Sequence, residues 1–239
     1  MAYTPGSFGR LRVFEDFLGL GTDNAAWDET GLGSIGNIAF TSVNEGSFAH
    51  TVDEPGGILA VTTDTADDDN WAGYVGVFKP SDGGCVMEAR FKVADITTAA
   101  VYCGFTETLS ATAPVMPAEY ATATLTCNGS GSMVGMLSDP DATTDLWRAV
   151  AGDGGVEETV YSAAAGPTND YWDVVRVEIG PDGKGTCILN GKVIHEFTSF
   201  LTTTDIQHAV LLVENRSGAA NTLEIDYFFA KGYRDWTDS

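Results

Sequence analysis

The carboxylates best placed for catalysis are Glu224 and Asp226, which lie two residues apart near the end of the chain. Side chains two residues apart on a β-strand point to the same face of a sheet, so both acids would line one surface. Hydrolysis of a glycoside needs two separate carboxyl groups, and glycosidases built on β-sandwiches carry a row that looks like E-x-D-x-E. The third acid of that row is missing here, because Phe228 and Phe229 occupy its place. We therefore predict that Glu224 and Asp226 are solvated strand carboxylates and that the chain is not an enzyme.

Two aspartate-rich segments are the candidates for a metal site, since carboxylate oxygens are the ligands that calcium prefers. The segments contain Asp64, Asp67, Asp68 and Asp69, and then Asp139, Asp141 and Asp145. Neither follows the EF-hand spacing D-x-[DN]-x-[DN]-G. We predict solvated loops, with calcium as the alternative and no other cofactor.

Residues 31–36 read GLGSIG and match the dinucleotide pattern G-x-G-x-x-G. A phosphate cradle of this kind needs a strand before it and a helix after it, and neither flank has the required pattern. We predict a loop without a nucleotide.

Cysteine and histidine chemistry has no support in the spacing. No C-x-x-C pair and no G-x-S-x-G elbow is present, so zinc binding, a disulfide framework and a nucleophilic serine are not indicated. The cysteines are expected to be small buried hydrophobic residues. The residues concerned are Cys85, Cys103, Cys127 and Cys187, with single histidines at His50, His195 and His208.

The net charge of −22 excludes nucleic acid as a direct partner, because 34 acidic residues face only 12 basic ones. Basic residues come singly except for Arg10 and Arg12, which follow a Pro-Gly break. We predict that residues 1–12 form an arm in which these two arginines contact carboxylates of a partner. The N-terminus lacks the apolar core of a secretory signal and no apolar run is long enough to span a membrane, so we expect folding in a cytoplasm.

Period-two patterning of apolar residues runs through the chain and indicates β-structure throughout. In residues 86–93 alternate positions are apolar, and residues 171–197 read as three strands joined by a PDGKG turn and an Asn190-Gly191 turn. Asn-Gly is typical of a type I′ hairpin, which would set Leu189 opposite Lys192. In the last strand the same alternation places Leu223, Ile225, Tyr227 and Phe229 on one buried face.

About a dozen short strands without crossover helices predict an all-β fold, an antiparallel two-sheet β-sandwich of the jelly-roll type. We expect one sandwich domain over residues 13–239 behind the arm. Five tryptophans, Trp27, Trp71, Trp147, Trp172 and Trp236, are expected mostly in the core, with one or two facing a ligand or partner.

Scattered segments carry a resemblance to a known group. The chain opens with FEDFLG, continues through GGILAVTTDTADDDNWAGYVGVFKPSDGGCVMEARFKV and PDATTDLW, and ends on WDVVRVEIGPDGKGTCILNGKVI and LEIDYFFAKGYR. In these segments it resembles jelly-roll virion proteins of tailed bacteriophages, which look like the concanavalin A and laminin-G sandwich class.

The resemblance implies a capsid decoration protein, a head fibre or a tail component, often a homo-oligomer, whose partner is the major capsid protein or another virion protein. A carbohydrate-binding module on a fibre is the second hypothesis and a sandwich-fold glycosidase the third. The implied location is the virion, and no membrane contact is expected.

Overall fold

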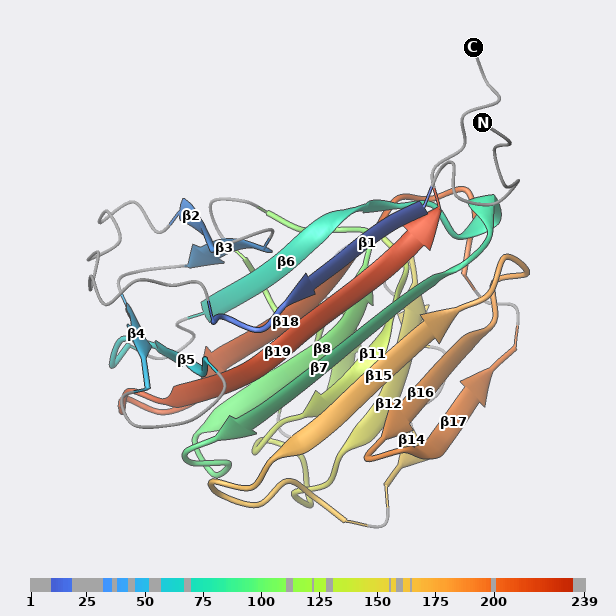
Figure 1. Cartoon of the computed structure of the whole chain (residues 1–239). Coiled ribbons are helices and arrows are strands. Elements are labelled where there is room, and N and C mark those ends of the chain that lie inside the picture. The colour runs from blue at the N-terminus through green and yellow to red at the C-terminus, as the bar shows by residue number, and fades with distance from the viewer. Residues whose placement is uncertain are drawn as a thin grey trace.

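Two antiparallel sheets packed face to face make up the fold (Figure 1). The computed structural model describes residues 10–18, 32–35, 38–42, 46–51, 57–66, 70–110, 114–121, 123–127, 131–154, 156–157, 161–163, 165–198 and 201–233. Every strand pairing among these residues is antiparallel, and a 3₁₀ turn at Pro80–Asp82 is their only helical element. The predicted all-β sandwich is confirmed.

The first sheet, called sheet A, has the strand order β17-β16-β15-β7-β19-β5-β4, and β1 also pairs with β19. Its long β19 pairs with β5 near its start and with β1 near its end, so β1 in blue lies beside β19 in red (Figure 1). The strands are β17 (Lys192–Phe197), β16 (Gly185–Leu189), β15 (Asp173–Ile179), β7 (Cys85–Val93), β19 (Thr222–Tyr233), β5 (Leu59–Thr62), β4 (Ser47–His50) and β1 (Arg10–Glu15).

The second sheet, called sheet B, has the order β13-β12-β11-β8-β18-β6-β3-β2, with β14 paired to β12. A separate hairpin, β9 (Ala118–Ala121) and β10 (Thr124–Cys127), forms a two-stranded sheet of its own. The strands of sheet B are β13 (Val156–Glu157), β12 (Arg148–Asp153), β11 (Met133–Ser138), β8 (Ala99–Thr106), β18 (Gln207–Asn215), β6 (Asn70–Phe78), β3 (Ile38–Ser42), β2 (Leu32–Ile35) and β14 (Tyr161–Ser162).

The main core lies between the two sheets and follows the expected alternation on sheet A. On β7 the side chains of Met87, Ala89, Phe91 and Val93 are buried, while the intervening polar side chains are partly exposed. The predicted Asn190-Gly191 hairpin is also confirmed: both residues have positive φ, and Leu189 pairs with Lys192. Period-two patterning therefore located these strands and their faces correctly.

The two faces of the sandwich differ in burial. On sheet A, β7 and β15 alternate between buried and half-buried positions, whereas on sheet B the described positions of β8 and β11 are buried throughout. A strand buried at every position is covered on both faces. Sheet A therefore has an open outer face, and sheet B is covered on its outer face as well.

A β-bulge changes the prediction for the last strand. The register of β19 against β7 shifts between Ile225 and Tyr227, so the side chains beyond the bulge exchange faces. Phe228 is buried at 1% exposure, whereas Tyr227 and Phe229 are half-buried on the outer face. The predicted single row of four inward residues was therefore wrong beyond Ile225.

Two further predictions need correction. Arg10 and Arg12 belong to β1 and pair with Tyr233 and Lys231, so sheet A begins inside the predicted arm of residues 1–12. Residues 1–9 lie outside the described part. The GLGSIG segment was predicted as a loop, but Leu32–Ile35 forms β2 and pairs with β3.

Candidate functional site

The open face of sheet A carries cross-strand ion pairs at its centre. Lys92 Nζ lies 3.0 Å from Glu224 Oε2, and Arg90 pairs with Asp226. Arg176 pairs with Glu178 and with Glu88, the latter at 3.5 Å. Three of these four pairs join neighbouring strands and so connect β15, β7 and β19, while the pair of Arg176 with Glu178 lies within β15.

Glu224 and Asp226 therefore have a different setting from the one predicted. Both project from the outer face, away from buried Ile225, but each is 21% exposed at its side chain and paired with a cation. Asp226 is the extra residue of the bulge, and the outward side chains that follow it on β19 are Tyr227, Phe229, Lys231 and Tyr233, so no third carboxylate follows on this face of the strand.

Two consecutive aromatic residues, Tyr171 and Trp172, lie beside these ion pairs. The guanidinium carbon of Arg90 is 4.5 Å from the ring centroid of Trp172, and Lys92 Nζ is 5.1 Å from it. Tyr171 next to it is 65% exposed. By contrast Trp71 and Trp147 are buried, as expected for most tryptophans, while Trp27 and Trp236 lie outside the described residues.

A second part of the same face, named here the β1–β19 strip, combines cations with aromatic rings. It consists of Arg10, Arg12 and Phe14 of β1 with Phe229, Lys231 and Tyr233 of β19. The guanidinium of Arg10 lies 5.4 Å from the ring centroid of Tyr233, and that of Arg12 lies 5.5 Å from that of Phe229. A pocket of about 410 Å³ opens along the strip.

The strip is cationic in an otherwise acidic protein. Within the described residues Arg10, Arg12 and Lys231 take part in no ion pair, in contrast to Arg90, Lys92, Arg176 and Arg216. The structure thus brings the two predicted partner-binding arginines together with a third cation that sequence reasoning missed. Lys231 and Tyr233 lie more than 200 residues along the chain from β1, so no local pattern could have joined them.

The β9–β10 hairpin covers the central part of the outer face of sheet B. Tyr102, Leu137 and Leu212 of sheet B pack under apolar side chains of the hairpin and of the segment before it, and these side chains form a second hydrophobic cluster. The covering residues are Met116, Ala118, Tyr120 and Leu125. At these positions the hairpin covers the central strands of sheet B, whereas His208 of β18 on the same face is only half-buried.

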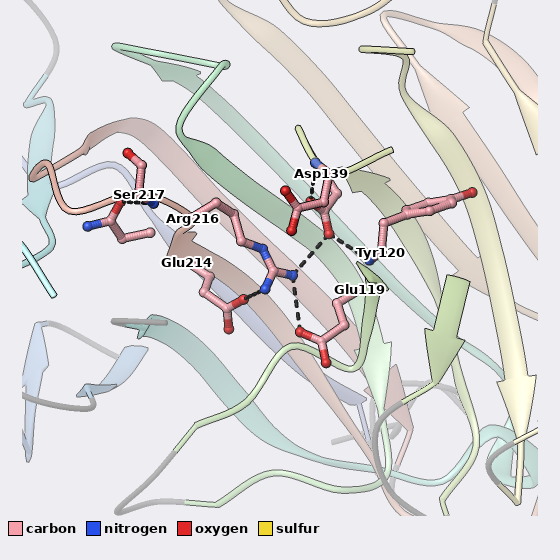
Figure 2. Close-up of polar contacts among 8 residues, drawn as sticks. Glu119, Tyr120, Asp139, Glu214, Arg216 and Ser217 are labelled. Atoms are coloured by element: carbon pink, nitrogen blue, oxygen red, sulfur yellow. Dashed lines mark hydrogen bonds and ion pairs between the residues drawn. The ribbon is translucent and has the colours of Figure 1, made fainter. Parts of the chain in front are cut away.

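A buried ion-pair network fixes the hairpin to the sheet (Figure 2). Arg216, just beyond β18, has an 8% exposed side chain, and its Nη2 lies 3.1 Å from Glu119 Oε2 of β9 and 3.0 Å from Asp139 Oδ2. Its Nη1 lies 2.6 Å from Glu214 Oε1. Burial lowers the pKa of Arg216, but the three carboxylates outweigh burial and raise the pKa overall, so the guanidinium is firmly charged.

Asp139 was a candidate calcium ligand, and the structure gives it another role. Its Oδ2 accepts hydrogen bonds from the backbone N–H of Tyr120 and from Arg216, and its Oδ1 accepts one from the backbone N–H of Asp141. Both oxygens of the buried carboxylate are therefore engaged by nitrogen donors. An arginine occupies the place that a cation would take.

Of the other calcium candidates, the structure describes Asp64, Asp141 and Asp145. Asp64, Asp141 and Asp145 are exposed, and Asp64 accepts a hydrogen bond from the backbone N–H of Thr65. Asp67, Asp68 and Asp69 lie outside the described residues. Among the residues that are described, no group of three or more His, Cys, Asp or Glu is placed to hold a metal ion.

The thiols and His208 fit structural roles. Cys85, Cys103 and Cys187 are buried, and burial raises the pKa of each well above its ordinary value, so they stay protonated. His208 is half-buried with Nδ1 2.8 Å from the carbonyl oxygen of Gly76, and burial lowers its pKa.

In the described residues no helix is long and apolar enough to cross a membrane.

No protein-family model matches the chain, and no curated protein matches it in sequence. Solved structures do match. A protein of unknown function from Shewanella oneidensis MR-1 has a TM-score of 0.58 at 15% identity, covering 100% of this chain and 92% of that one. The Emp47p carbohydrate recognition domain has a TM-score of 0.55 at 11% identity, covering 90% and 100%. A β-glucanase from Bacillus licheniformis has a TM-score of 0.55 at 12% identity, covering 93% and 98%.

At these identities the likeness is one of fold. The sandwich is of the concanavalin A-like type, shared by lectin domains and glucanases. A shared fold does not carry a shared function, because functional sites differ between proteins of one fold.

Proposed function

We propose that this protein is a non-catalytic structural protein of a tailed-phage particle, a decoration protein that binds the capsid surface. The observation that carries the non-catalytic part is the cover that the β9–β10 hairpin and its apolar cluster place over the centre of the outer face of sheet B. On the open face of sheet A, the four central carboxylates are paired with arginine or lysine. Glycoside hydrolysis needs a proton-donating acid and a second carboxylate across an accessible bond, and the described residues of these two faces offer no such unpaired pair.

Support for the particle as the location comes from the sequence segments that resemble jelly-roll virion proteins. A stable sandwich with an open face that mixes charges and aromatic rings has the composition of a protein-binding surface, in which Tyr, Trp and Arg are enriched. The partner in this proposal is the major capsid protein or another virion protein.

The test is sedimentation with phage particles assembled without this protein. We expect the purified chain to co-sediment saturably with the particles, at a ratio set by the coat lattice. A chain that stays in the supernatant at micromolar concentration with intact particles would contradict the proposal.

A carbohydrate-binding module is the second candidate function, and two observations favour it. Some proteins of similar fold are named as carbohydrate recognition domains, and the half-exposed Trp172 beside exposed Tyr171 could stack on a sugar ring. A glycan array distinguishes the candidates: saturable binding of one glycan, lost in a Tyr171→Ala/Trp172→Ala variant, would favour this function over the first.

A glycosidase is the third candidate, tested through the acids that it would need. The parent chain and a Glu224→Gln/Asp226→Asn variant are screened for release of reducing sugar from β-glucans. Activity in the parent that disappears in the variant would overturn the non-catalytic proposal.

A further inference from the structure

We infer that the β1–β19 strip binds an acidic polypeptide segment in an extended conformation, presented by the coat of the particle. This inference rests on the proposed function for the identity of the partner. The strip itself is defined by Arg10, Arg12, Lys231 and the rings of Phe14, Phe229 and Tyr233.

Charge indicates the sign of the partner. Only 12 of the 239 residues are basic, and three of them line this one pocket without an ion pair among the described residues. The acid that follows on β1, Glu15, accepts a hydrogen bond from the backbone N–H of Phe17 and makes no ion pair with the strip among the described residues. A cationic pocket on a protein of net charge −22 is complementary to carboxylates.

Spacing indicates the conformation of the partner. Arg10 and Arg12 are two residues apart on one strand, so their side chains leave the same face about 7 Å apart. An extended segment with acids at alternate positions presents its carboxylates at the same interval. An arginine can bind a carboxylate by donating two parallel hydrogen bonds to it.

The aromatic rings favour a polypeptide over nucleic acid. Phe14 is 50% exposed and stacks on Tyr227 with ring centroids 5.9 Å apart, so it extends the strip with apolar surface. Binding of a nucleic-acid backbone depends on many cations that neutralise phosphates, and the strip has only three. The negative net charge of the protein also opposes such binding. Rings and arginines together are typical of residues that dominate protein interfaces.

The experiment compares three proteins: the parent, Arg12→Glu and the control Lys192→Glu. Lys192 is exposed on β17 at the far edge of sheet A. The substitution Lys192→Glu therefore reverses one positive charge, as Arg12→Glu does, but outside the strip. Each is tested for co-sedimentation with particles and for binding of a fluorescent Glu-Thr-Glu-Thr-Glu peptide by anisotropy, at low and high salt. Thermal unfolding checks that each variant folds, and Arg12→Gln repeats the test with the charge removed rather than reversed.

We expect Arg12→Glu to weaken both interactions by about tenfold or more while Lys192→Glu matches the parent. If Arg12→Glu binds particles as well as the parent does, the strip is not the binding site, and the proposed function is unaffected. Peptide binding that depends on Arg12, without particle binding, would support the strip and contradict the proposed function. Preference for heparin or DNA over the peptide, or self-association through Arg12, would overturn the acidic coat segment as the partner.

Discussion

Replacing Arg216 with methionine should destabilise the protein by about 3–5 kcal/mol, because removing one partner of a buried ion pair leaves uncompensated charge. The side chain of Arg216 is 8% exposed, and those of Asp139 and Glu214 are 0% and 4% exposed. Three carboxylates share this one guanidinium. Methionine keeps much of the apolar volume of the arginine stem but none of its charge, so the variant isolates the electrostatic loss.

The matched control is Arg176→Met. Arg176 also pairs with two carboxylates, Glu88 and Glu178, but its side chain is 36% exposed on sheet A. Exposed pairs contribute about 0–1 kcal/mol, so the control should lose far less stability. Urea unfolding at neutral pH gives both values, and hydrogen exchange should show that Arg216→Met opens the β9–β10 hairpin before the two sheets.

The loss should also depend on pH. Acid neutralises the negative charge left uncompensated in Arg216→Met, so the difference in stability from the parent should shrink as the pH falls. If Arg216→Met is no less stable than Arg176→Met, or if the hairpin exchanges no faster than in the parent, the network does not hold the hairpin on sheet B.

Three further predictions concern the bulge in β19, His208 and the four cysteines. Phe228→Ala should lower the free energy of unfolding by about 3–5 kcal/mol because it removes a core side chain, whereas Phe229→Ala should lower it clearly less. Equal losses of stability in urea unfolding would contradict the bulge. Burial lowers the pKa of His208, so the unfolded chain binds a proton there more readily than the folded protein does, and the protein loses stability as the pH falls below about 6.5. Between pH 8 and 5.5 the His208→Gln variant should therefore lose less stability than the parent. An identical loss of stability in the two proteins would refute this role of His208. Thiol titration without reductant should find four reactive groups after denaturation and few before it, and two or fewer after denaturation would contradict the structural role of the cysteines.

The sequence was sufficient for the sandwich and for much of its register, since period two and turn chemistry act over a few residues. Met87 and Phe91 face the core and Asn190-Gly191 turns as predicted. The bulge beside Asp226 was not predicted, because nothing in the local pattern marks the extra residue. From that point the alternation assigned Phe229 to the wrong face.

The candidate sites depended on contacts between distant segments. Arg216 meets Glu119 across 97 residues and Asp139 across 77, and Lys231 reaches β1 only through the pairing of the first and last described strands. One available signal was missed: the unbroken apolar runs in residues 99–105 and 209–213 indicate strands covered on both faces. Those runs predict that something in the chain must cover sheet B.

The most direct measurement of the central claim is quantitative mass spectrometry of purified phage particles from the source that encodes this chain. A decoration protein is predicted to be present at a fixed ratio to the major capsid protein and to stay on the particle through a density gradient. Intact particles that lack the chain would contradict the account.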